Sequence, residues 1–126
     1  MLPSPSGETI LVVDDEAIVL SFVTNVLLAS GYKPILAVDG EQGFQRFMEQ
    51  PHNIDLVLTD IDMPKLSGPD LARKIREVDQ RVKLMFMTGY TATDLIAAEF
   101  SACPTLRKPF APSRLTSAIR ECLDFG

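Results

Sequence analysis

Short apolar runs alternate along the chain with longer segments in which apolar residues recur at helical spacing. Residues 10–13, 56–58 and 84–87 are almost continuously apolar. Such runs are typical of strands that are covered on both faces of a parallel sheet. Residues 35–38 and 105–107 are weaker strand candidates, and their shorter or more polar runs suit the edges of a sheet. The pattern therefore predicts five strands.

The segments between and after these runs predict helices, because apolar residues at i, i+3, i+4 and i+7 form one helical face. The last segment, residues 115–123, is the clearest, since its charged residues fall on other faces. Residues 93–100 are a less regular candidate for a short fourth helix. The expected apolar faces are, in chain order, Ile18, Phe22 and Val26; Phe44, Phe47 and Met48; Leu71, Ile75 and Val78; and Leu115, Ala118, Ile119, Cys122 and Leu123.

Glycine and proline positions agree with these helices. Gly31 suits the left-handed end of the first helix, and Pro69 and Pro112 suit first-turn positions. Five strands alternating with five helices predict an α/β fold in which a parallel sheet lies between helices. Ligands of such sheets bind beyond the carboxyl ends of the strands, where the strand order reverses.

The composition limits the class of protein. The chain has 126 residues, of which 46% are hydrophobic and 23% charged, as expected for one folded globular domain. We expect a flexible tail or linker over the Pro- and Ser-rich residues 1–7, and one domain over residues 8–126. The net charge is −5, with 17 acidic and 12 basic residues. Direct binding to nucleic acid is therefore not expected, because phosphate backbones require a basic surface.

Cysteine usage and hydropathy point to the cytoplasm. Cys103 and Cys122 match neither a redox pair nor a zinc pattern, and we interpret both as reduced core thiols. No apolar stretch reaches the ~18 residues that cross a membrane, and residues 1–7 lack the features of a signal peptide. We expect a cytoplasmic protein without membrane insertion.

Polar residues with related chemistry lie at the end of four of the predicted strands or directly after it. Asp14 and Asp15 follow the first strand, Asp60 and Thr88 end the third and fourth, and Lys108 follows the fifth. In an open parallel sheet these strand ends converge on one shallow cleft. Each residue also has a structural interpretation as a helix N-cap, a turn residue or a surface charge. Their combination favours a functional site.

Crowded carboxylates favour a divalent metal ion with oxygen ligands, and Mg²⁺ is the best match. We expect Asp15 and Asp60 to bind Mg²⁺, the backbone carbonyl of Asp62 to complete the ligand set, and Asp14 to act directly or through water.

The same residues suit phosphoryl transfer, which needs alignment and charge neutralisation. Asp60 is the expected nucleophile. Lys108 would neutralise one phosphoryl oxygen, and Thr88 would donate a hydrogen bond to another.

Four motifs together resemble the receiver domains of response regulators in two-component signalling, and the resemblance extends from about Glu8 to Leu123. The motifs are ILVVDDE at residues 10–16, LTDIDMP at 58–64, MTGY at 87–90 and KPF at 108–110. The resemblance implies a flavodoxin-like (βα)5 three-layer sandwich with strand order 2-1-3-4-5. It also implies phosphorylation of Asp60 by a histidine kinase or a histidine phosphotransfer protein, slow self-catalysed hydrolysis, and a cis bond between Lys108 and Pro109. Phosphorylation would switch binding to a downstream protein target, so the domain is a signalling phosphoacceptor rather than an enzyme with a separate substrate.

The chain departs from the family pattern at Thr105, where receivers usually carry an aromatic switch residue. Thr88 and Thr105 are the expected switch positions. We expect Tyr90, two residues after Thr88, to take over part of the aromatic role by covering the site and slowing hydrolysis of phospho-Asp60. His52, the single histidine, lies in a polar loop and is interpreted as a surface residue.

Two other functions remain alternatives. A receiver-like module could bind partners without being phosphorylated. The departure at Thr105 keeps that alternative open, although the intact site residues argue against it. A phosphatase of the haloacid-dehalogenase type would share the pair Asp60 and Asp62, but it carries that pair on its first strand.

The sequence fits both a stand-alone regulator and the receiver of a hybrid histidine kinase. It also leaves open whether the domain forms a homodimer through the last two helices. Output is expected to pass through a partner.

Overall fold

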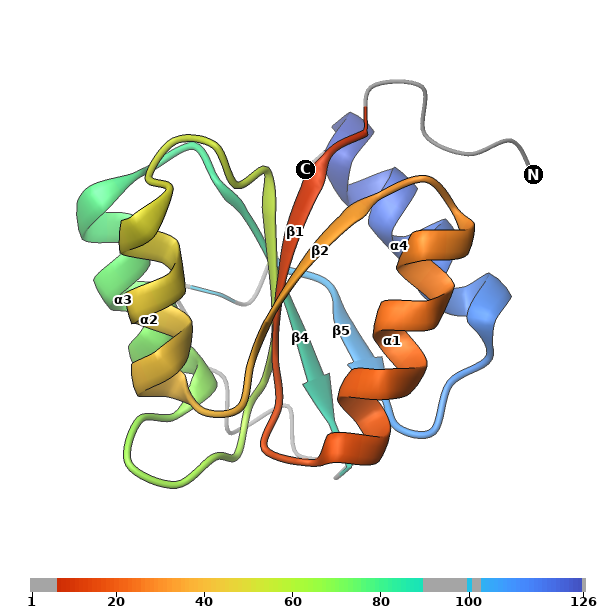
Figure 1. Cartoon of the computed structure of the whole chain (residues 1–126), viewed down its shortest axis with the longest axis horizontal. Coiled ribbons are helices and arrows are strands. Elements are labelled where there is room, and N and C mark those ends of the chain that lie inside the picture. Colours follow the sequence, from red (N-terminus) through yellow and green to blue (C-terminus); the bar gives the residue numbers. More distant parts are fainter. Residues whose placement is uncertain (1–6, 90–99, 101–102, 126) are drawn as a thin grey trace.

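Five parallel strands form one sheet in the order β2-β1-β3-β4-β5 in the computed structural model (Figure 1). The structure describes residues 7–89, 100 and 103–125, and its strands lie within these ranges. This is the flavodoxin-like order expected from the resemblance, with the two weak strand candidates at the edges. The strands are β1 Thr9–Val13, β2 Lys33–Ala37, β3 Leu56–Asp60, β4 Lys83–Thr88 and β5 Thr105–Arg107.

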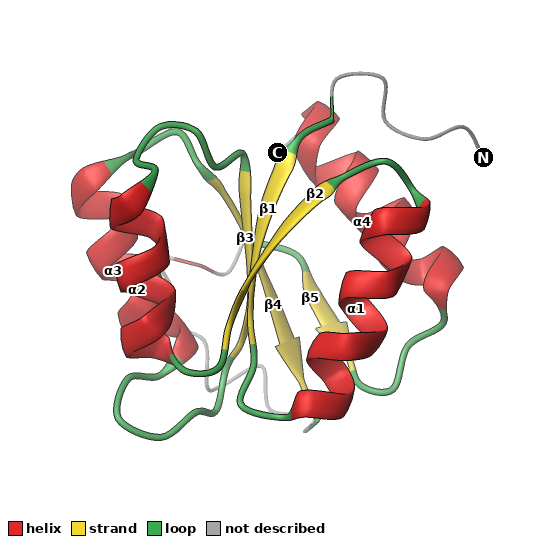
Figure 2. Cartoon of the chain, viewed as in Figure 1, coloured by secondary structure: helices red, strands yellow, loops and turns green. Residues whose placement is uncertain are grey.

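Helices cover both faces of the sheet, as Figure 2 shows. Helices α1 (Ala17–Ala29) and α4 (Pro112–Phe125) lie on one face, and α2 (Gly40–Glu49) and α3 (Gly68–Val78) lie on the other. Residues 93–99 of the predicted fourth helix lie outside the described residues. The three-layer arrangement explains the unbroken apolar runs, because each central strand has to bury both of its faces.

The central strand β1 shows how one run serves two cores. Ile10 and Val12 pack in the cluster under α1 and α4, whereas Leu11 and Val13 pack in the cluster under α2 and α3. All four side chains are fully buried. Since successive side chains of a strand point to opposite faces, a continuous apolar run is required here.

The predicted apolar face is confirmed for α4, where Leu115, Ala118, Ile119 and Cys122 are buried. The predicted face of α1 is only partly correct. Phe22 and Val26 are half-buried and pack against the core, but Ile18 is 86% exposed. The buried residues of α1 are Leu20, Val23 and Leu27. Helix α1 is apolar on almost every side, so helical spacing alone did not select the face that packs on the sheet. In α2, Phe47 is buried as expected, but Met48 is 44% exposed.

The residues predicted to begin and end helices do so. Gly31 follows Ser30, the C-cap of α1, and has φ +87°, a conformation that glycine adopts without steric cost. Pro69 lies in the first turn of α3, and Pro112 begins α4. Both cysteines are free: Cys122 is buried as expected, and Cys103 is only half-buried. Within the described residues, no helix combines the length and hydropathy that a membrane span requires.

Candidate functional site

The carboxyl ends of the strands bring the predicted polar residues to one edge of the sheet. Asp60 and Thr88 are the last residues of β3 and β4. Asp14 follows β1, and its N–H continues the β1–β2 pairing by donating to the Ala37 carbonyl oxygen at 3.2 Å. The N–H of Lys108 donates to the carbonyl oxygen of Thr88 at 2.7 Å. The register of the sheet thus places side chains from four segments around one point.

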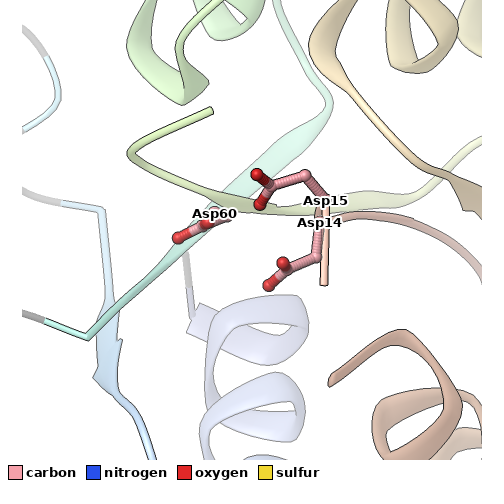
Figure 3. Close-up of side chains that lie close together, drawn as sticks. All are labelled: Asp14, Asp15 and Asp60. Carbon is pink, nitrogen blue, oxygen red and sulfur yellow. The ribbon is translucent and has the colours of Figure 1, made fainter. Parts of the chain in front are cut away.

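Three carboxylates gather at this point, as Figure 3 shows. One carboxylate oxygen from each of Asp14, Asp15 and Asp60 lies within 4.8 Å of the other two. Asp14 and Asp60 are buried, whereas Asp15 is exposed. Carboxylate oxygens at this separation suit a hard divalent cation.

The ammonium group of Lys108 lies among carboxylates, and the Lys108 side chain is only 13% exposed. Its Nζ atom lies 2.7 Å from Asp14 Oδ2, 3.4 Å from Asp60 Oδ1 and 3.1 Å from Glu16 Oε1. Three carboxylates therefore share this cation. The prediction of the site did not include Glu16, although the residue follows Asp14 and Asp15 directly in the sequence.

The crowding changes the acidity of these groups. Burial, followed by the nearby charge of Asp14, raises the pKa of Asp60 to about 6. Burial also raises the pKa of Asp14, against the opposing effect of Lys108. For Lys108, burial alone would lower the pKa, but the hydrogen bond to Asp14 and the charge of Asp60 outweigh it and raise the pKa. The site therefore holds excess negative charge around a firmly protonated lysine.

The alternative interpretation of Asp14 and Asp15 as helix N-caps is wrong. The N-cap of α1 is Glu16, and no side chain caps the helix there. Asp14 Oδ1 instead accepts a hydrogen bond from the N–H of Glu16 at 2.8 Å. This contact turns the chain after β1 and leaves Asp14 Oδ2 directed toward Lys108.

The remaining predicted positions lie around this centre or outside the described residues. Asp62 is exposed in the loop after β3. Thr105 is half-buried at the start of β5 and pairs with Phe86 of β4. The peptide bond between Lys108 and Pro109 is cis. Tyr90 lies outside the described residues.

Comparison with known proteins gives one family. A family model described as "Response regulator receiver domain" matches residues 10–120. The receiver protein CpdR of Brucella abortus (strain 2308) is 33% identical over 116 residues, which cover 90% of this chain and 95% of CpdR. The sensor kinase CckA of the same organism is 31% identical over 119 residues, which cover 92% of this chain. The first three curated relatives are longer proteins, of which the chain spans 12%, 45% and 48%.

Solved structures give the same result. A response regulator receiver domain protein from Clostridium thermocellum has a TM-score of 0.85 and 33% identity, covering 93% of this chain and 94% of that chain. The response regulator TrrA from Thermotoga maritima, solved in complex with Mg²⁺-BeF, has a TM-score of 0.81 and 30% identity. That match covers 91% of this chain and 98% of the TrrA chain.

Proposed function

The chain belongs to the response regulator receiver domain family, and on that premise we propose that it accepts a phosphoryl group on Asp60 in a two-component phosphorelay. The position of Asp60 carries this proposal. Its carboxylate is buried at the carboxyl end of β3, 3.4 Å from Lys108 Nζ and beside Asp14 and Asp15. With a pKa of about 6, Asp60 is mainly a carboxylate at neutral pH and is available as a nucleophile.

The transfer is a displacement at phosphorus. A carboxylate oxygen of Asp60 attacks the phosphorus atom of the donor, and the bond between phosphorus and the donor group breaks. The electron pair of that bond leaves with the donor, and Asp60 becomes an acyl phosphate. Lys108 neutralises one phosphoryl oxygen and Thr88 donates a hydrogen bond to another. Attack of water on the same phosphorus later restores the carboxylate and releases inorganic phosphate.

The donor set of the site fits Mg²⁺. The carboxylates of Asp14, Asp15 and Asp60 would hold the ion together with the backbone carbonyl of Asp62. Two of these carboxylates have raised pKa values because they are buried close together, a cost that a divalent cation removes. When bound, Mg²⁺ supplies positive charge that offsets the crowded carboxylates and the phosphoryl oxygens.

Receiver domains act through protein partners. We assign the donor here as a phosphohistidine of a histidine kinase or of a histidine phosphotransfer protein, and the output as binding to a downstream protein target. The likeness to CpdR supports a stand-alone regulator, and the likeness to the CckA kinase supports the receiver of a hybrid kinase. Such partners are consistent with a cytoplasmic domain, and we propose that localisation, with no direct contact to nucleic acid and no insertion into a membrane. Thr88 and Thr105, with Tyr90, are the positions through which phosphorylation would change the surface.

Phosphorylation by a small donor tests the function directly. The chain is incubated with Mg²⁺ and acetyl phosphate, and its intact mass is compared with that of Asp60→Asn. We expect an adduct of about 80 Da on the native chain only, and we expect hydroxylamine to remove it. Absence of an adduct from acetyl phosphate and from a phosphohistidine donor, together with failure to bind Mg²⁺, would instead support a module that binds partners without being phosphorylated, the alternative that Thr105 leaves open.

A further inference from the structure

Glu16 forms an ion pair at the proposed phosphorylation site that the proposed chemistry does not use. Its Oε1 lies 3.1 Å from Lys108 Nζ, and its side chain is 63% exposed while that of Lys108 is 13% exposed. Glu16 and Lys108 also line a largely apolar groove of about 370 Å³. Glu16 thus lies between the buried carboxylates and solvent.

The backbone of Glu16 is fixed, whereas its carboxylate is free to leave the pair. The N–H of Glu16 donates to Asp14 Oδ1 at 2.8 Å, and its carbonyl accepts from the N–H of Leu20 at 3.1 Å. These bonds hold the residue at the start of α1. Rotation about the side-chain bonds alone is enough to carry the exposed carboxylate into water.

The ammonium group of Lys108 has three N–H donors, and three carboxylates surround it. Asp14 and Asp60 are buried, so separating either from the cation leaves a charge uncompensated in the interior, which is costly. Glu16 is exposed, and water replaces its partner at little cost. Of the three carboxylates, Glu16 is therefore the easiest for an incoming anion to displace.

We propose that Glu16 is a positioning residue: it pairs with Lys108 in the unphosphorylated domain and competes with the phosphoryl group for that cation. Phosphorylation exchanges the carboxylate of Glu16 for a phosphoryl oxygen on Lys108. The identity of the competing anion, a phosphoryl group on Asp60, rests on the proposed function. The ion pair between Glu16 and Lys108 does not depend on that function.

The first test compares two substitutions that remove the same charge. Glu16→Gln should raise the rate of phosphorylation by acetyl phosphate by roughly two- to fivefold, the size typical of one exposed ion pair. The affinity for beryllofluoride in the presence of Mg²⁺, measured by calorimetry, should rise by the same factor. Glu41→Gln is the matched control, because Glu41 is 65% exposed and pairs with Lys65 at 3.6 Å. Glu41 lies in the first turn of α2, at the same edge of the sheet. An equal effect of both substitutions, or slower phosphorylation of Glu16→Gln, would overturn the proposal.

The second test needs no phosphoryl donor. Urea unfolding of the native chain, Glu16→Gln, Lys108→Met and the double variant gives the coupling between the two residues. We expect favourable coupling in metal-free protein, and its absence would overturn the pair. Lys108→Met also removes the cation that beryllofluoride needs, so the exchange is measured with Glu16→Gln alone. The loss of stability caused by Glu16→Gln in metal-free protein should disappear when Mg²⁺ and beryllofluoride are bound, and an unchanged loss would overturn the exchange. Failure of acetyl phosphate to modify Asp60 would count against the proposed function and leave the metal-free result unaffected.

Discussion

Gly68, the first residue of α3, lies directly against the carbonyl group of Asp60, and a Cβ atom at position 68 would overlap that carbonyl oxygen. The N–H of Gly68 donates to the carbonyl oxygen of Ile61 at 2.9 Å. Helix α3 is thus anchored on the backbone of the residue that we propose is phosphorylated. The absence of a side chain, rather than an unusual φ angle, is what this contact requires.

Substitution of Gly68 by Ala should therefore destabilise the domain. A methyl group at this position pushes α3 away from β3, and overpacking of this kind costs about 1 to 3 kcal/mol in the free energy of unfolding. The matched control is Gly89→Ala, because a Cβ atom at Gly89 would have no atom of the described residues within 4 Å. Urea unfolding at neutral pH measures both variants, and similar losses would contradict the proposed contact.

The raised pKa of Asp60 predicts a pH-dependent gain in stability for Asp60→Asn in metal-free protein. The folded state holds this proton more tightly than the unfolded chain, so the contribution of Asp60 to stability falls as the pH rises from 3.8 to about 6. Because Asn carries no charge, Asp60→Asn should raise the free energy of unfolding relative to the native chain. This gain should be absent below pH 3.8 and reach at most about 3 kcal/mol at pH 7.5. Urea midpoints between pH 4 and 8, with EDTA present, measure the difference. A gain that does not change with pH would count against charge crowding as its cause.

The sequence was sufficient to predict the fold and the position of the site. The apolar runs of β1, β3 and β4 predicted strands buried on both faces, and the order of polar residues after successive strands predicted their convergence. Asp14, Asp60, Thr88 and Lys108 meet at one edge because parallel strands all end there.

Contacts that depend on side-chain direction could not be predicted. No sequence pattern distinguishes Glu16 from an ordinary exposed residue at the start of a helix, and its pair with Lys108 depends on how the chain turns after β1. The buried face of α1 was predicted only in part, because apolar residues occupy several faces of that helix. Only the docking of α1 on β1 and α4 decides which of these residues is covered.

The corrected face of α1 predicts opposite results for two similar substitutions. Leu27 is fully buried, whereas Ile18 is 86% exposed. Leu27→Ala should lower the free energy of unfolding by about 2 to 5 kcal/mol, because it removes buried methyl groups and leaves a cavity. Ile18→Ala should change it by no more than about 0.5 kcal/mol. Urea unfolding of the two variants decides between the faces, and a larger loss for Ile18→Ala would restore the face expected from the sequence.

Removal of the exposed carboxylate of Asp15 tests the metal site without disturbing the buried pairs. Mg²⁺ should stabilise the native chain as its concentration rises above the dissociation constant, because the ion binds the folded state and not the unfolded one. Asp15→Asn should leave the metal-free stability nearly unchanged, since Asp15 is exposed, and should weaken Mg²⁺ binding by at least about tenfold. Thermal unfolding at several Mg²⁺ concentrations measures both quantities. Equal stabilisation of the native chain and of Asp15→Asn by Mg²⁺ would exclude Asp15 from the metal site. As a control, the same measurement with Ca²⁺ in place of Mg²⁺ shows whether binding depends on the identity of the ion.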